Sequence, residues 1–244
     1  MAIIFGDVDA TRLRTFLAEW EPKRGGSGRG IIDLQAGSPA MKCDKLPGSA
    51  PLDIPAAYSS MDHSLVAIHL RRKSPGTAQT LEVTQPIETD SAVVLHNGTW
   101  LPYTGKAWLQ FAGGRAPGEI SDTLVIAGAI EQLGLQGFVH AALKSAEDPI
   151  GVLIVHDRAS GETYSILVVN PDDDPAKDGS LTLYSVQLPG AWLYASKPPE
   201  EMDALAVERL VPAHFDEGRD VGVWRFTAGG PVALSIEDLP AIGE

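Results

Sequence analysis

Cysteine is nearly absent from the chain, which has one, Cys43, among 244 residues. A single thiol cannot form a disulfide within the chain, and it excludes most cysteine-based metal sites. Because disulfides persist mainly in oxidising compartments, their absence favours an intracellular, reducing origin. We therefore expect a cytoplasmic protein, or a virion component if the chain is viral.

Basic residues are scarce as well. The chain has 19 Lys and Arg residues against 32 Asp and Glu residues, so its formal net charge is −13. An acidic surface repels phosphate backbones. We therefore expect no nucleic-acid partner.

Long apolar runs, leader sequences and nucleotide fingerprints are also missing. No apolar run approaches the ~20 residues that span a bilayer, and the start "MAIIFGDVDA" has neither a basic leader nor a long apolar region. No P-loop or dinucleotide motif is present. The sequence predicts no signal peptide, no membrane partner and no cofactor. The run Asp172-Asp173-Asp174 could bind a metal, but its flanking prolines favour a solvated loop, so we expect no metal site.

The order of expected elements predicts the fold class. Strands are expected at 2–6, 30–37, 63–72 and 91–100, and a hairpin at 151–170. One helix follows the N-cap candidate Asp9 and is ended by Pro22 and the glycines of "KRGGSGRG" at 23–30. Another covers 121–134, capped by Ser121 or Asp122 and ended by Gly134. Short strands at 180–196, a helix at 198–210 and a hairpin at about 219–237 complete the chain. Without regular βαβ alternation, this order predicts an α+β fold with antiparallel sheets, as a single domain over 1–244 with an irregular excursion at about 36–61.

The stretch "AVVLHNGTW" at 92–100 has two interpretations. An apolar strand that ends in Asn97-Gly98 is typical of a hairpin turn. Alternatively, the strand end presents an amide side chain and a glycine N–H to a group that carries negative charge.

Four stretches occur in an informative order: "RGGSGRGI" at 24–31, "IHLRR" at 68–72 with "QP" at 85–86, "LHNGTW" at 95–100, and "SDTLVI" at 121–126. The set resembles the glutaminase domain of class II glutamine amidotransferases, which are N-terminal-nucleophile (Ntn) hydrolases. The resemblance covers residue 2 to about 200. It implies a four-layer αββα sandwich in which two antiparallel sheets pack between helices.

The resemblance also implies roles for individual residues. Arg71 would hold the α-carboxylate of L-glutamine or a related amino acid through its two-pronged donors, and Asp122 would pair with the α-ammonium. The Asn97 side chain and the Gly98 N–H would form an oxyanion hole. Simpler interpretations stay open: Arg71 lies beside Arg72 and Lys73 and could be a solvated surface charge, and Asp122 could only cap a helix. We assign no catalytic role to His69 or His96.

The nucleophile that the resemblance implies is missing. The family usually begins Met-Cys-Gly-Ile, and the cysteine attacks the amide once the methionine is removed. Here Ala2 occupies that position, and an alanine methyl group cannot act as a nucleophile. Ile3 in place of glycine, and the lack of an acidic residue after Thr123, favour a natural relative without a nucleophile. An engineered Cys-to-Ala change, or a takeover by Cys43 between its two nearby lysines, are the alternatives.

Two classes of function follow. In one, the pocket still binds glutamine without hydrolysing it, and enzyme activity is uncertain because the nucleophile is missing. The related alternative is that the chain is an engineered Cys-to-Ala knock-out of an active glutaminase that supplies ammonia to a separate synthase. In the other, the fold serves as a structural or assembly module of a larger complex or virus particle. The sequence does not identify an ammonia acceptor or an oligomeric state.

Overall fold

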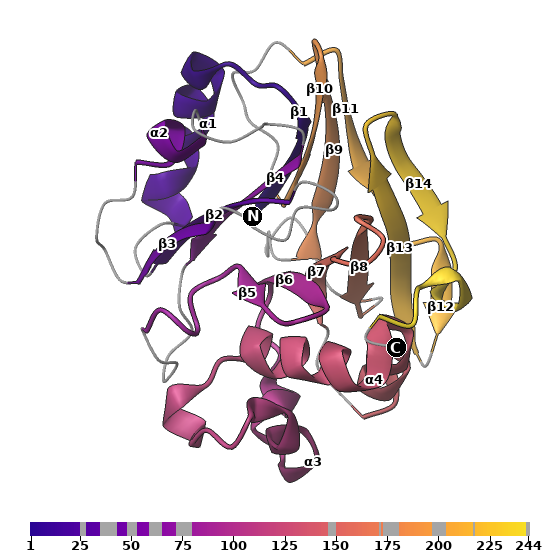
Figure 1. The fold of residues 1–244 in the computed structure, drawn as a ribbon. Coiled ribbons are helices and arrows are strands. Elements are labelled where there is room, and N and C mark those ends of the chain that lie inside the picture. The colour runs from indigo at the N-terminus through magenta and orange to yellow at the C-terminus, as the bar shows by residue number, and fades with distance from the viewer. Residues whose placement is uncertain are drawn as a thin grey trace.

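Two antiparallel β-sheets pack face to face, and helices cover both outer faces (Figure 1). The computed structural model describes residues 1–24, 28–34, 43–47, 53–58, 65–71, 80–145, 150–170, 172, 181–196, 204–216 and 218–242. The α+β class and the four-layer αββα arrangement expected from the sequence are confirmed.

The first sheet has the strand order β11-β9-β10-β1-β4-β2-β3. Its strands are β1 (Ala2–Gly6), β2 (Gly28–Asp33), β3 (Cys43–Pro47), β4 (Leu65–Arg71), β9 (Leu183–Leu188), β10 (Ala191–Ala195) and β11 (Ala206–Leu210). Strand β1 lies in the middle and pairs with β10 on one side and β4 on the other, with Ala2 opposite Ile68. The helices α1 (Ala10–Arg24) and α2 (Ile54–Tyr58) cover its outer face.

The second sheet has the strand order β12-β13-β8-β7-β6-β5, and β14 pairs with β13. Its strands are β5 (Ile87–Glu88), β6 (Ala92–Asn97), β7 (Gly151–Asp157), β8 (Thr163–Val169), β12 (His214–Asp216), β13 (Arg219–Thr227) and β14 (Gly230–Leu234). The long helix α4 (Asp122–Ser145) covers its outer face. Beyond α4 lie the short helical turns η1 (Leu101–Thr104), α3 (Lys106–Leu109), η2 (Gln110–Ala112) and η3 (Pro117–Glu119).

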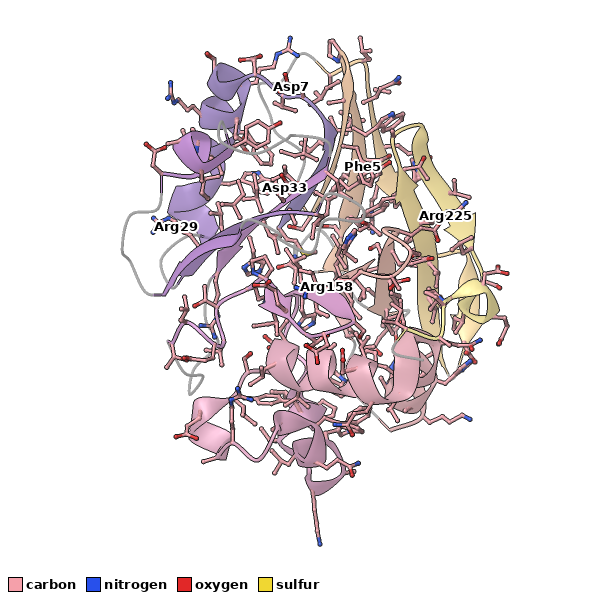
Figure 2. All side chains as sticks on the ribbon, viewed as in Figure 1. Phe5, Asp7, Arg29, Asp33, Arg158 and Arg225 are labelled. Atoms are coloured by element: carbon pink, nitrogen blue, oxygen red, sulfur yellow. The ribbon has the colours of Figure 1, made fainter. Side chains whose placement is uncertain are left out.

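Alternation along the strands creates three apolar layers, because successive side chains of a strand point to opposite faces. On β4, Val66 and Ile68 pack toward α1 and α2, whereas Leu65 and Ala67 pack against the second sheet. The layer between the sheets includes an edge-to-face contact between Tyr194 and Phe5, with ring centroids 5.7 Å apart; Phe5 is labelled in Figure 2. This parity decides which residues can reach a site between the sheets.

Local signals explain where α1 begins. The Asp9 carboxylate accepts hydrogen bonds from the backbone N–H groups of Thr11 and Arg12, at 2.9 and 3.0 Å. Asp9 is therefore the N-cap that the sequence predicts. The helix runs past Pro22 to Arg24, the residue before the glycines that the sequence predicts to end it together with Pro22. Beyond the first turn a proline removes one hydrogen bond and crowds the carbonyl group four residues before it, so Pro22 favours an end to the helix within the next few residues.

Helix α4 is longer than expected. Ser121 caps it by accepting a hydrogen bond from the Leu124 N–H at 3.2 Å. Gly134 does interrupt it, with a φ of 72°, but a second helical segment follows directly. By length and composition alone the stretch Asp122–Lys144 could cross a membrane, yet half of its most apolar window is buried inside the protein. Core helices pass the same test, so the composition is weak evidence for a membrane partner.

Two parts of the chain differ from the sequence-based expectation. The region 36–61 contains strand β3 and helix α2 among its described residues, so it is not wholly irregular. The helix expected at 198–210 is wrong for its last five residues, because Ala206–Leu210 form β11 and pair with β9; residues 198–203 lie outside the described residues. Pairing with a neighbouring strand overrides the local helical preference of this segment.

The buried histidine on β7 gives the fold a predicted pH dependence. His156 is 1% exposed, and its Nδ1 lies 3.0 Å from the Thr163 hydroxyl. Burial lowers the pKa of His156 to about 4, and the positive charge of Arg158 adds to this against the opposing effect of Asp157. The unfolded chain therefore binds more protons than the folded chain between about pH 4 and pH 6.5, and stability falls as the pH falls through this window.

We expect urea unfolding to show that His156→Leu removes part of this dependence. Between pH 7 and pH 4.5 the wild type should lose about 2 kcal/mol more unfolding free energy than the variant. Parallel curves of unfolding free energy against pH would contradict the assignment.

Candidate functional site

The end of β4 carries two polar side chains into the space between the sheets. His69 and Arg71 lie on the same face of β4 as Leu65 and Ala67, which pack against the second sheet. Both are buried, at 5% and 6% exposure. Arg71 is therefore not a solvated surface charge.

The facing end of β6 carries Asn97 and Gly98. Asn97 has the parity of Val93 and Leu95, which belong to the layer between the sheets. A Cβ atom added at Gly98 would lie 2.5 Å from the Ile150 carbonyl oxygen and 2.9 Å from His96 Nε2. The start of β7 therefore leaves no room for a side chain, which explains why this position requires glycine.

His96 points to the other face of β6, toward α4. Its Nε2 lies 2.5 Å from the Ile150 carbonyl oxygen, and its Nδ1 lies 3.5 Å from Asp122 Oδ2. Burial by itself lowers the pKa of His96, but the charge of Asp122 and the contact with Ile150 outweigh it and raise the pKa above the ordinary 6.5. His96 thus links the loop at 97–98 to the first turn of α4.

Asp122 is the first residue of α4, and both of its carboxylate oxygens are engaged. Oδ1 accepts the Thr123 N–H at 2.7 Å, and Oδ2 accepts the Trp100 N–H at 3.2 Å. Burial alone would raise the pKa of Asp122, but His96 and these N–H donors lower it. Asp122 therefore carries a negative charge, although Ser121 is the residue that caps the helix.

The charges of Arg71 and Asp122 influence each other across the two sheets. Burial lowers the pKa of Arg71, while the negative charge of Asp122 opposes that shift. Burial, the amino group of Met1 and Arg71 together hold the pKa of His69 well below its usual range, so its imidazole is neutral. A cation, an anion and amide donors near one another suit a zwitterionic ligand that also has a polar side chain.

Ala2 does not share this site. Its side chain is fully buried and packs toward α1 and α2, on the face of the first sheet away from His69 and Arg71. Met1 and Ile3 have the opposite parity and lie between the sheets. Met1 is therefore the N-terminal residue whose side chain lies on the same side of the first sheet as the predicted pocket. Ala2 is the next residue, and its side chain lies on the opposite face.

The other candidates do not join the site. Cys43 is the first residue of β3 and pairs with Ile32 near the edge of the first sheet. Of the acidic run at 172–174, the structure describes only Asp172. Among the described residues, no group of three His, Cys, Asp or Glu side chains is placed to hold a metal ion.

Sequence reasoning assigned no role to three residues that surround these groups: Gln85, His96 and Thr123. The Gln85 side chain bonds to both backbone groups of His96 and to the Thr123 hydroxyl. All three lie in stretches that carry the resemblance, "QP", "LHNGTW" and "SDTLVI", and that was the available signal. Their contacts became visible only in three dimensions.

Comparison with known proteins supports the fold. No family model matches the chain, and no curated protein matches it in sequence. Among solved structures it is similar to a glutamine phosphoribosylpyrophosphate amidotransferase from B. subtilis in complex with ADP and GMP, with a TM-score of 0.61 and 18% identity. It is also similar to an allosteric regulatory enzyme of purine biosynthesis, with a TM-score of 0.62 and 17% identity.

Each of these alignments covers 96% of this chain and 48% of the other, so the chain spans about half the length of the structures it matches. At this identity the similarity concerns the fold. The chain therefore has the Ntn-hydrolase-like fold found in a class II glutamine amidotransferase.

Proposed function

We propose that the chain binds L-glutamine, or a closely related amino acid, without hydrolysing it. The observation that carries this proposal is that buried Arg71 and the mostly buried carboxylate of Asp122, whose side chain is 14% exposed, interact electrostatically, in a fold shared with an amidotransferase. Arg71 would hold the carboxylate, Asp122 the ammonium, and Asn97 with the Gly98 N–H the side-chain amide oxygen.

The absence of hydrolysis follows from the chemistry of the N-terminal residues. Neither the thioether of Met1 nor the methyl group of Ala2 can attack an amide carbon. Cys43 lies on β3, and β2 and β4 separate that strand from β1 in the first sheet. An acceptor of ammonia is then unnecessary, and a separate synthase would be a partner only for a form that carries a nucleophile.

Calorimetric titration with L-glutamine tests the proposal. We expect saturable binding by the wild type and at least about thirtyfold weaker binding by Arg71→Ala, because the variant loses a charged, two-pronged contact. We also expect no release of ammonia from glutamine. The analogue of glutamine that lacks the α-amino group should bind more weakly than glutamine, because Asp122 then has no ammonium group to pair with.

A matched control separates binding from general electrostatics. Arg225 on β13 also pairs with a carboxylate, Glu162, at 2.7 Å, and it is labelled in Figure 2. Arg225→Ala should leave glutamine affinity unchanged. Arg71→Lys keeps the charge but not the planar fork, and should recover only part of the affinity. If the folded wild type fails to bind glutamine at millimolar concentration, the proposal is wrong.

An assembly role is the second candidate, and the edge of the first sheet favours it. Among the strands that the structure describes, β11 pairs only with β9 and ends the sheet. Leu205, Val207 and Val211, on and beside it, are 65%, 51% and 61% exposed. Open strand edges with apolar side chains are templates for pairing with another chain. A glutamine-independent complex that Val207→Lys disrupts would support this candidate.

A further inference from the structure

The Gln85 side chain replaces a strand backbone at the open edge of β6. Strand β5 pairs with β6 only through Ile87 with Val94 and Glu88 with Val93. Beyond that point Gln85 Oε1 accepts the His96 backbone N–H at 2.7 Å, and Gln85 Nε2 donates to the His96 carbonyl oxygen at 3.0 Å. One side-chain amide thus satisfies both backbone groups of the residue that precedes Asn97.

The same amide reaches helix α4. Gln85 Nε2 also donates to the Thr123 hydroxyl oxygen at 2.8 Å, and that hydroxyl donates to Asp122 Oδ1 at 3.3 Å. Asp122 Oδ2 in turn lies 3.5 Å from His96 Nδ1. These contacts form a closed ring through Gln85, Thr123, Asp122 and His96, hereafter the Gln85 ring.

Three of the four members of the Gln85 ring are shielded from water, and the fourth, Asp122, has a side chain that is 14% exposed. Gln85, His96 and Thr123 are 6%, 2% and 1% exposed. Hydrogen bonds in such surroundings are strong, and a donor or acceptor left without a partner is costly. The ring therefore has one favoured arrangement, and losing one member strains the others. Among the described residues, the charged and titratable groups that act on the ring are Arg71 and His69 from β4 and Tyr103 from η1. The amino group of Met1 acts on His69.

We propose that Gln85 and Thr123 are positioning residues, which hold the Asn97-Gly98 loop at a fixed place relative to Asp122. This inference rests on the proposed function. In that function Asp122, a member of the ring, accepts the ammonium, and Asn97 and Gly98, which follow His96, bind the amide oxygen. Neither Gln85 nor Thr123 is required to touch the ligand. Gln85 holds the end of β6 through its hydrogen bonds to the backbone of His96. Thr123 connects Gln85 to α4, the helix that begins with Asp122.

Substitutions at Thr123 provide a matched test. Thr123→Val keeps the shape of the side chain but removes the hydroxyl that joins Gln85 to Asp122, whereas Thr123→Ser keeps the hydroxyl. We expect about tenfold weaker glutamine binding by Thr123→Val, the loss associated with one buried hydrogen bond. Thr123→Ser should bind within about threefold of the wild type. Gln85→Met, which removes every contact of the amide, should lose more than Thr123→Val.

A second readout needs no ligand. In NMR spectra of the free protein, Thr123→Val should shift the backbone amide signals of Asn97 and Gly98 and speed their hydrogen exchange, and Thr123→Ser should restore both. If the wild type does not bind glutamine, the proposed function fails, and these amide signals still decide whether the ring positions the loop. Unchanged signals in Thr123→Val, or equal losses in Val and Ser variants, would overturn the inference.

Discussion

A cysteine at position 1 is expected to react readily with an electrophile, whereas a cysteine at position 2 should be nearly inert. The two variants, Met1→Cys and Ala2→Cys, differ by one position along β1 but lie on opposite faces of the first sheet. In native protein treated with iodoacetamide, we expect labelling at position 1 to be at least about tenfold faster than at position 2, since the reactive thiolate needs both access and nearby positive charge.

The physical reason is the surroundings of each face. Position 1 carries the chain's amino group, which acts on His69 together with Arg71. Met1 is 4% exposed, but a cysteine is smaller than the methionine it replaces and so leaves space for a small reagent. Positive charge lowers the pKa of a thiol and so increases its thiolate fraction. Position 2 is fully buried among apolar side chains of α1 and α2, where a thiol stays protonated and out of reach.

The experiment has an internal control and a consequence for catalysis. Each variant is released from a cleavable leader, so that the residue at position 1 has a free amino group, and labelled peptides are identified by mass so that Cys43 is counted separately. In urea the two thiols should react at similar rates.

Release of ammonia from glutamine is expected only from Met1→Cys, in which a nucleophile and a base share the face of Arg71. Faster labelling at position 2 would show that the parity of β1 is wrong.

Gly30→Ala is expected to destabilise the protein by about 3 kcal/mol or more, at the upper end of the cost of overpacking a core. A Cβ atom on Gly30 would lie 2.0 Å from the Gln85 carbonyl oxygen and 2.6 Å from Pro86 Cδ. A backbone oxygen and a proline ring cannot rotate away as the end of a flexible side chain can. The segment before β5 would have to separate from β2, and Gln85 would move with it.

Gly118→Ala is the matched control. Gly118 lies in the exposed turn η3, and an added Cβ atom there has no neighbour within 4 Å. Its unfolding free energy in urea should stay within about 0.5 kcal/mol of the wild type. Because Gly30→Ala also displaces Gln85, the folded fraction of that variant should bind glutamine more weakly. Equal stability of the two variants would mean that β2 and the Gln85 segment do not pack as described.

Local pattern in the sequence was enough to predict the fold class. Strands, turns and helix starts such as Asp9 and Ser121 depend on neighbouring residues, and their order predicted an α+β fold with antiparallel sheets. The resemblance implied that the two sheets pack between helices. The ordered motifs also identified Arg71, Asn97, Gly98 and Asp122 as a group, and the structure brings their segments to facing ends of the sheets. Their roles toward glutamine are still predictions.

Partners distant in the chain decided the rest. Residues 206–210 form a strand because β9 offers them an edge. Ala2 faces the helices, and Met1 the predicted pocket, because pairing with β4 and β10 sets the phase of β1; a shift of one residue would exchange the two faces. Gln85 and Thr123 meet although 38 positions separate them. Strand phase and buried hydrogen bonds are settled only when the sheets and α4 pack together, and so only the tertiary structure could assign them.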